Sequence, residues 1–250
     1  MATGMARGAA ARGKRIAFGD MRRIRWDANS EKIFRGNPNI AWPGAEGRSD
    51  IEWIPYYKGH RIYNRQVGDR WEWNLDFHAV PGEMYFSDEE KIAGERYGKR
   101  FVLIESNIEA YKSCAPNKDW GRRNYQRIAD ELKNKGYRVA QFAYEKSGPL
   151  LHNVETFQTS SFRSAVAILA NAALYIGPEG GLHHAAAAVD TPAVVLFGGF
   201  IPPSVTGYAP HANLTGGAEA CGSLKPCEHC LQAMQRITCD EVLDLALERL

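Results

Sequence analysis

Residues 174–197 constrain the fold of this chain more than any other stretch. They read LYIGPEGGLHHAAAAVDTPAVVLF: an apolar run, a glycine-rich turn, an alanine-rich segment and a second apolar run. This order predicts a buried strand, a tight turn, a short helix and another buried strand.

The glycine-rich turn in this stretch is a candidate anion site. Gly180 and Gly181 carry no Cβ, so a ligand can approach the backbone, and the next amides belong to the first turn of the helix. Unpaired amides at the positive end of a helix dipole suit a phosphate, and His183 and His184 add donors. The alternative is that the glycines only permit a tight connection between strand and helix.

Strand and helix signals alternate from residue 101 onward. Apolar strands are expected at 101–104, 137–142, 173–177 and 193–197. Helical spacing of apolar residues predicts a helix over 125–132 that ends near Gly136, and another that starts after Ser161. This alternation predicts an α/β fold with a parallel, Rossmann-like sheet and right-handed crossovers. Ligands of such sheets lie at the carboxyl ends of the strands, where the glycine-rich turn falls.

The part before residue 101 is less regular. Residues 1–15 are basic and rich in Gly and Ala without an apolar core, which predicts a disordered tail and not a secretion signal. A short strand over 14–18 is followed by Asp20, a candidate catalytic carboxylate or an ordinary turn residue. Residues 27–100 predict short strands and loops, with one alternating strand over 71–77. No run of eighteen apolar residues occurs, so no membrane span and a cytoplasmic location are expected.

Charge and tryptophan are concentrated near the N-terminus. The net charge is +2, but residues 1–75 hold 14 Lys and Arg against 8 Asp and Glu, which favours an anionic partner. Five of the six Trp also lie there, so the rings could stack on a carbohydrate or on single-stranded nucleic acid. The alternative is that these rings form the core of a small irregular lobe.

A cysteine motif follows near the C-terminus. Its members are spaced Cys-x5-Cys-x2-Cys-x8-Cys and comprise Cys221, Cys227, Cys230 and Cys239. Four thiols in a reducing compartment predict a closed, structural zinc or iron site, with unligated thiols as the alternative. Cys114 is left over as an ordinary thiol.

Several of these motifs together resemble glycosyltransferase family 9, the heptosyltransferase family. GPEGGLHHAAAA followed by DTPAVVLFG resembles the family signature GPD(S/T)GLxHxA. The Lys-x-Trp at 118–120, the Phe-Gly-Asp at 18–20, and the MQRITCDEV at 234–242 resemble three further family motifs. The resemblance covers 101–250 well and the N-terminal part only around Asp20.

The resemblance implies a two-lobed, GT-B type fold. A reduced acceptor lobe would span 16–100, and a nucleotide-sugar lobe would span 101–250 and include the cysteine-rich segment 221–239. The implied reaction inverts configuration in one displacement without a catalytic metal ion. Its donor is a nucleoside-diphosphate sugar, by family default ADP-heptose, and its acceptor is a lipopolysaccharide core sugar or a protein.

The resemblance also implies roles for single residues. Asp20 would be the base, and Lys118 would neutralise the departing diphosphate together with the helix start at Gly181 and Leu182 and with His183 or His184. Glu145, just after the 137–142 strand, would hold the ribose hydroxyls. Glu179 would accept hydrogen bonds from backbone or sugar groups beside the turn.

Two departures from the family motif leave other functions open. Gly180 replaces a Ser or Thr hydroxyl and Glu179 replaces an Asp, and the N-terminal lobe is short. A second hypothesis is therefore a non-catalytic nucleotide-sugar-binding protein, and a third, less favoured one is a nucleic-acid binder. The sequence does not identify the sugar, the nucleotide, the acceptor, the metal or the oligomeric state.

Overall fold

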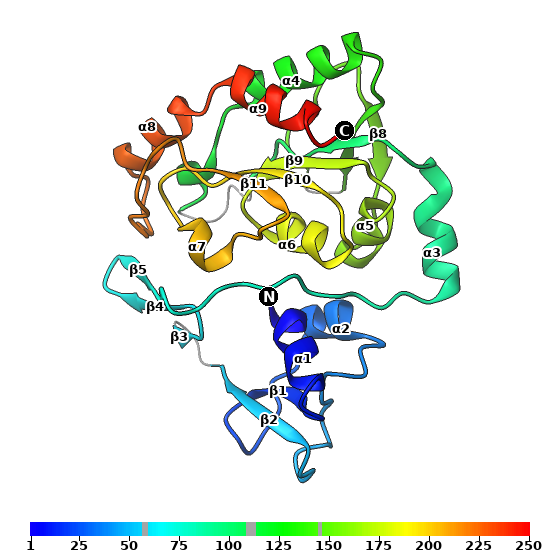
Figure 1. Cartoon of the computed structure of the whole chain (residues 1–250), viewed down its shortest axis with the longest axis vertical. Coiled ribbons are helices and arrows are strands. Elements are labelled where there is room, and N and C mark those ends of the chain that lie inside the picture. The colour runs from blue at the N-terminus through cyan, green and yellow to red at the C-terminus, as the bar shows by residue number, and fades with distance from the viewer. Residues whose placement is uncertain (57–59, 109–113, 145–146) are drawn as a thin grey trace.

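A computed structural model gives the structure of the protein, and it describes residues 1–56, 60–108, 114–144 and 147–250. A six-stranded parallel sheet forms its centre (Figure 1). The strands are β6 (Val102–Ile104), β7 (Val139–Ala143), β8 (Glu155–Gln158), β9 (Leu174–Pro178), β10 (Ala193–Leu196) and β11 (His211–Leu214). The predicted parallel, Rossmann-like sheet is confirmed.

The strand order is β8-β7-β6-β9-β10-β11. The chain first winds outward from β6 to β8, then crosses back to β9 beside β6 and winds the other way. This is the doubly wound order of dinucleotide-binding folds, and its switch point lies between β6 and β9.

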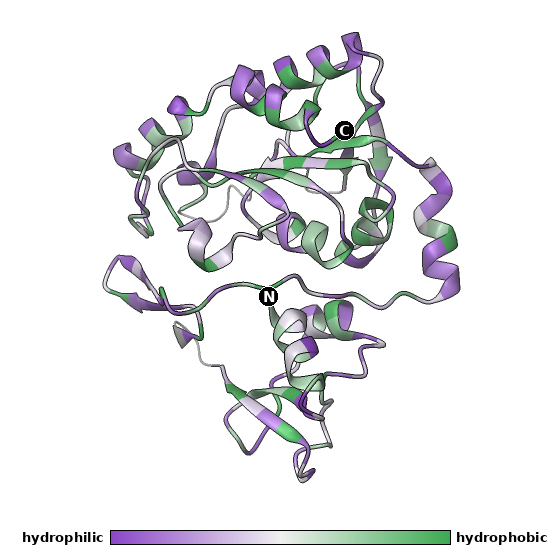
Figure 2. Ribbon diagram, in the orientation of Figure 1, coloured by the Kyte–Doolittle hydropathy of each residue, from purple (hydrophilic) through white to green (hydrophobic). Residues whose placement is uncertain are grey.

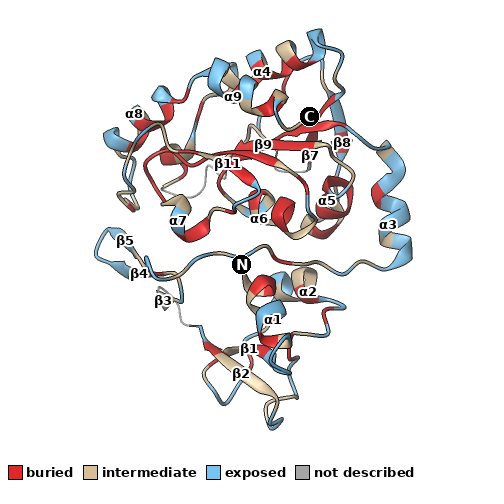
Figure 3. Cartoon of the chain, in the orientation of Figure 1, coloured by how far each residue is buried: buried red, intermediate tan, exposed pale blue. Residues whose placement is uncertain are grey.

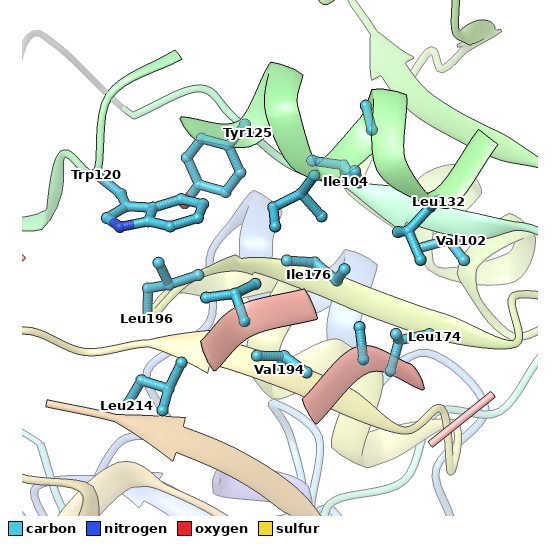
Figure 4. Packing of buried hydrophobic residues seen from close by; sticks show 14 of the residues in the cluster. Val102, Ile104, Trp120, Tyr125, Leu132, Leu174, Ile176, Val194, Leu196 and Leu214 are labelled. Carbon is cyan, nitrogen blue, oxygen red and sulfur yellow. The ribbon is translucent and has the colours of Figure 1, made fainter. Parts of the chain in front are cut away.

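Helices cover both faces of the sheet, because each face is fully apolar. α4 (Arg122–Asn134) and α9 (Cys239–Leu247) pack on one face, and α5 (Phe162–Leu169) and α6 (Gly181–Ala188) pack on the other. Figure 4 shows Tyr125 and Leu132 of α4 above Val102, Ile104 and Ile176 of the sheet. α7 (Pro203–Thr206) and α8 (Glu228–Arg236) complete this lobe.

Most local expectations hold in this lobe. Ser161 caps α5 with a reciprocal capping box, and Thr238 caps α9 by accepting from the Glu241 amide at 3.1 Å. Gly136 ends the α4 region at a φ of 87°. The strands β8 and β11 were not expected, since each has only four residues and a weak apolar signal.

The N-terminal region has its own small cores. β1 (Arg15–Gly19) pairs in parallel with β2 (Ile51–Pro55), beside α1 (Ala2–Ala10) and α2 (Ala28–Phe34). The prediction of a disordered tail over 1–15 is wrong, because Ala6 and Ala9 are fully buried in α1. Small side chains let α1 approach residues 80–83, where Thr3 Oγ1 accepts a hydrogen bond from the Glu83 amide at 3.0 Å.

Residues 60–97 run along the sheet lobe. β3 (His60–Arg61), β4 (Asn64–Val67) and β5 (Arg70–Trp73) form an antiparallel sheet, so the expected strand over 71–77 ends at Trp73. Trp71 donates its amide to the Gly222 carbonyl at 2.8 Å. Further on, α3 (Asp88–Gly94) and the short helix η1 (Glu95–Tyr97) lie against α5, where Arg163 is paired with Glu90.

Burial and hydropathy separate these parts. In Figure 2 the central strands are the most continuous apolar elements, and in Figure 3 they are buried while β4, β5 and much of α3 are exposed. Trp26 packs on Trp42 at 4.7 Å between ring centroids, and Trp73 packs edge-on against Phe200 at 5.9 Å. Four of the five N-terminal tryptophans are half-buried against hydrophobic cores, whereas Trp42 is 38% exposed, so the packing favours the core interpretation for four of the rings. In the described ranges, no helix combines the length and apolar character that crossing a bilayer requires.

Candidate donor site at the switch point of the sheet

Acidic residues stand at both strands of the switch point. Glu105 directly follows β6 and Glu179 directly follows β9, and these strands are hydrogen-bonded neighbours. Because loops leave the two strands in opposite directions, a crevice opens between them at their carboxyl ends. The geometry therefore places the predicted turn at 179–181 where a ligand of this fold is expected.

The backbone of the turn is accessible. An added Cβ at Gly180 would meet no described atom within 4 Å, whereas one at Gly181 would meet the Phe162 ring at 3.3 Å. No described side chain caps the start of α6, which leaves its first amides open to a ligand. Leu182, in the same turn, is half-buried against the core below the sheet. Gly180 thus offers space and not only a tight connection.

Lys118 lies against this turn. It ends the short helix η2 (Ala115–Lys118), and its ammonium donates to the Glu179 carboxylate and to the Glu179 carbonyl, the latter at 3.3 Å. The Lys118 side chain is 20% exposed and that of Glu179 only 5%. Sixty-one positions separate the two residues in the chain. The fold thus brings together the two places that a diphosphate site requires.

Two neighbours fix the position of Lys118. Asn117 is fully buried and donates to the carbonyls of Ser223 and Lys225 at 3.0 and 2.9 Å, while its Oδ1 accepts from the Cys227 amide at 2.8 Å. Trp120 is buried in the core and donates to the Ile237 carbonyl at 2.8 Å. Asn117 was not singled out from the sequence, because its role depends on a loop more than a hundred residues away.

Glu179 is an anchor for cations. Burial alone would raise its pKa, but the Lys118 ammonium and the hydrogen bond from His184 hold the pKa well below its usual range. His184 Nε2 lies 3.5 Å from Glu179 Oε1, and His184 Nδ1 lies 2.9 Å from the Tyr208 hydroxyl. Burial lowers the pKa of His184, so its imidazole is neutral at pH 7. Glu179 therefore holds Lys118 at the turn.

His183 points into the protein. It is fully buried, its ring packs edge-on against Phe197 at 5.4 Å, and neither ring nitrogen has a hydrogen-bond partner among the described residues. The expectation that His183 donates beside the turn is therefore not supported by its orientation. His184, next to it, remains the histidine that reaches Glu179.

Glu105 was not singled out from the sequence. Its carboxylate accepts from the Asn107 amide at 2.7 Å, and burial raises its pKa to about 7. A carboxyl with this pKa can exchange a proton at neutral pH. The available signal was an acidic residue at the end of a fully apolar strand.

Asp20 is the counterpart in the N-terminal region, where its side chain is 34% exposed. Its Oδ1 accepts from the amides of Arg23 and Arg22 at 2.8 and 3.1 Å, and these hydrogen bonds lower its pKa. Asp20 follows β1 as expected, and its carboxylate closes the turn. Glu145, the predicted ribose ligand, lies outside the described residues.

Three of the four cysteines form a group. Cys221 Sγ lies 3.2 Å from Cys230 Sγ and 3.8 Å from Cys227 Sγ. Cys239 is a correction to the predicted set: its thiol lies 3.7 Å from Asn124 Oδ1 on α4, and the group in the described residues contains only the other three. The Thr238 cap that starts α9 places Cys239 on the other side of the lobe, against α4.

A basic cavity of about 270 Å³ lies between α2, α3 and α5. Its charged lining residues are Lys32, Arg35, Glu90, Arg96 and Arg163. Arg163 is buried and paired with Glu90 at 2.5 Å, so the remaining charge of the lining is positive. Phe162, beside Arg163, is the residue that approaches Gly181.

Comparison with protein families gives one match. The model of glycosyltransferase family 9 (heptosyltransferase) matches residues 93–237, more than half of the chain. Among curated proteins, lipooligosaccharide heptosyltransferase 2 of Haemophilus influenzae is 29% identical over 108 residues. That match covers 38% of this chain and 30% of the relative, so the chain spans about a third of that protein's length.

Solved structures show the same fold. ADP-heptose lipopolysaccharide heptosyltransferase II of E. coli matches with a TM-score of 0.50 and 19% identity over 67% of this chain and 53% of its own. A family 9 glycosyl transferase from Veillonella parvula gives 0.62 and 12%, covering 89% of this chain and 86% of its own. The iron-containing dodecameric glycosyltransferase TibC from E. coli gives 0.58 and 16%, covering 87% and 64%.

Proposed function

The chain belongs to glycosyltransferase family 9, the heptosyltransferase family, and we propose that it transfers a sugar from a nucleoside-diphosphate sugar to a saccharide or protein acceptor. The observation that carries this proposal is the contact of Lys118 with the 179–181 turn at the switch point of the sheet. ADP-heptose is the proposed donor, because the similar E. coli structure is named for it.

In the proposed donor complex, the diphosphate lies on the open amides of Gly181 and Leu182. Lys118 turns from Glu179 toward the phosphates and neutralises the charge that develops on the leaving group. Glu179 does not contact phosphate, since two anions repel. It holds Lys118 and His184 at the turn before the donor arrives.

The proposed chemistry is a single inverting displacement at the anomeric carbon, without a catalytic metal ion. A base must take the proton of the acceptor hydroxyl. Asp20 is the proposed base, and its depressed pKa keeps it ionised at neutral pH. Glu105 is a second candidate, because it stands at the switch point and its pKa is about 7.

The basic cavity supports a place for an anionic group of the acceptor. Lys32 and Arg35 come from α2 of the N-terminal region, and Arg96 comes from the segment that follows α3. The cavity is lined by Ser161 and Arg163, the chain neighbours of Phe162, whose ring approaches Gly181. An acceptor that carries a carboxylate or phosphate would then be held by both regions of the chain.

We also propose a structural metal ion, zinc or iron, on Cys221, Cys227 and Cys230. Three thiols within reach of one ion suit either metal, and TibC is described as iron-containing. The ion would stiffen the loop that Asn117 holds, and so keep Lys118 at the turn. Thiolate ligands also support a reducing, cytoplasmic location.

Metal analysis of paired variants tests this ion. Cys227→Ser is expected to lose the ion of the cysteine group, which in the wild type should amount to about one ion per chain at that group. Cys239→Ser is the matched control and is expected to keep it, because Cys239 lies against α4. Equal metal content in the two variants would contradict the proposed set.

Donor turnover tests the proposed function. Wild type, Asp20→Asn and Glu105→Gln are each incubated with ADP-heptose, and both sugar transfer and hydrolysis are measured. Replacement of the residue that acts as the base is expected to lower the rate of sugar transfer by about 10²–10⁴-fold. Absence of transfer by wild type, with retained ADP-heptose binding, would favour a non-catalytic nucleotide-sugar-binding protein, and equal transfer by all three proteins would exclude both carboxylates as the base. A thermal-shift screen of nucleotide sugars identifies the donor, because a ligand of the folded state stabilises it.

A further inference from the structure

Glu179, His183 and His184, here called the Glu179 cluster, offer more potential metal-ligand atoms than the proposed diphosphate site uses. Glu179, His183 and His184 each offer one ligand atom, and the three atoms lie within 4.8 Å of one another. Only small side-chain movements would bring them to the spacing of ligands around one ion. Two imidazoles and one carboxylate are a common set for zinc, with a fourth position left for water.

His183 gives the second observation. It is fully buried, and both of its ring nitrogens lack hydrogen-bond partners among the described residues. A buried polar group without a partner destabilises the fold, so such groups call for a bound species that satisfies them. A metal ion at this cluster would use one of these nitrogens directly.

His184 is already oriented as a ligand. Its Nδ1 lies 2.9 Å from the Tyr208 hydroxyl, and its Nε2 faces Glu179 at 3.5 Å. Metal-binding histidines usually use the second ring nitrogen to bond a fixed partner in this way, which sets the ring orientation. Tyr208 is itself buried and packs against His183, with ring centroids 5.1 Å apart.

Lys118 already supplies positive charge at this place. Its ammonium bonds the Glu179 carboxylate, and its side chain remains 20% exposed. An incoming ion can therefore reach the carboxylate from solvent by displacing a flexible side chain. The cluster accepts a cation in either form, as an ammonium or as a metal.

We propose that Glu179, His183 and His184 bind a divalent transition-metal ion such as Zn²⁺, in competition with the Lys118 ammonium. This site is distinct from the cysteine group. It does not depend on sugar transfer, because it requires only the cluster and an ion.

Titration of the metal-stripped full chain with Co²⁺ tests the proposal. Cobalt on thiolates gives intense charge-transfer absorption together with strong visible bands, whereas cobalt on nitrogen and oxygen ligands gives only weak visible bands. The second site is therefore detected as Co²⁺ that binds without adding charge-transfer absorption. Wild type is expected to bind about one ion more than the cysteine group accounts for.

Three variants complete the test. His183→Phe keeps a ring against Phe197 and removes the unpartnered nitrogens, so it should fold and lose affinity at this site by roughly 100-fold or more. Lys118→Met should bind the ion at least several times more tightly, because the competing cation is gone. His152→Asn removes an exposed histidine and should change nothing.

Each outcome of the titration either supports or overturns the proposed metal site. Loss of about one bound Co²⁺ in His183→Phe, with the charge-transfer absorption unchanged, supports the site. The same number of ions and the same visible bands in wild type and His183→Phe would overturn it. Unchanged affinity in Lys118→Met would overturn the competition.

Discussion

The turn after β9 and the turn after β1 each place a carboxylate directly beyond a parallel strand. Glu179 is buried and bonded to Lys118, 61 positions away, and to His184 of the following helix. Asp20 is bonded to the amides of its own turn and faces solvent. Position at the end of a strand therefore does not by itself decide whether such a carboxylate holds a distant cation or closes its own loop.

Among the variants that test this comparison, Lys118→Ala should show the largest changes in stability and donor turnover. The change leaves the Glu179 carboxylate buried without its main cation, which is expected to cost about 3 kcal/mol of unfolding free energy. Donor turnover should fall by about 10²–10³-fold, because charge on the leaving diphosphate is lost. Urea unfolding and ADP-heptose turnover measure the two effects separately.

The double variant Lys118→Ala with Glu179→Gln is the control. Because the second change removes the unpaired negative charge of Glu179, it should restore most of the stability and none of the turnover. Full turnover in the single variant would remove Lys118 from the proposed mechanism. Unchanged stability would mean that the buried pair does not hold the turn.

Glu105 is a third carboxylate at the end of a strand, and its contribution to folding stability depends on pH. Burial raises its folded-state pKa to about 7 from a usual value of 4.5, so its contribution to stability is complete below about pH 4.5 and is lost as pH rises through 7. Between pH 5 and pH 8, wild type should lose about 1–3 kcal/mol that Glu105→Gln does not lose. Urea unfolding at both pH values measures the difference. Parallel pH profiles for the two proteins would contradict the burial of this carboxyl.

Asp20→Ala should show the smallest effect on stability. The exposed turn loses two hydrogen bonds to its own amides, and water can replace them. The urea midpoint is expected to stay close to that of wild type, in contrast to Glu179→Gln. A loss as large as that of Glu179→Gln would show that the two turns are equally important to the fold.

The sheet was predictable from the sequence because each of its main strands is a continuous apolar run. Residues 174–197 alone gave β9, α6 and β10, and the spacing of Tyr125, Ile128 and Leu132 gave α4. The strands β8 and β11 were not predicted, because four residues of mixed polarity show little periodicity. Helix α1 was not predicted, because it packs through small side chains such as Ala6 and Ala9, which give a weak apolar signal, and through its close approach to residues 80–83.

The candidate site was predictable only in outline. The Lys-x-Trp motif and the glycine-rich turn indicated which segments meet, but not that Glu179 would take the Lys118 charge. Asn117 and Glu105 depend on tertiary contacts and burial that a linear pattern does not contain. Cys239 was included by spacing, and the start of α9 moves it away from the other thiols.

Gly180 has a consequence for how this enzyme family can diversify. Its backbone is extended, at a φ of 166°, and a side chain there would meet no described atom within 4 Å. The fold thus has room for a serine at this position, and a single codon change could add a hydroxyl to the turn without a compensating mutation. The polarity of this turn can therefore evolve independently of the folding stability of the chain.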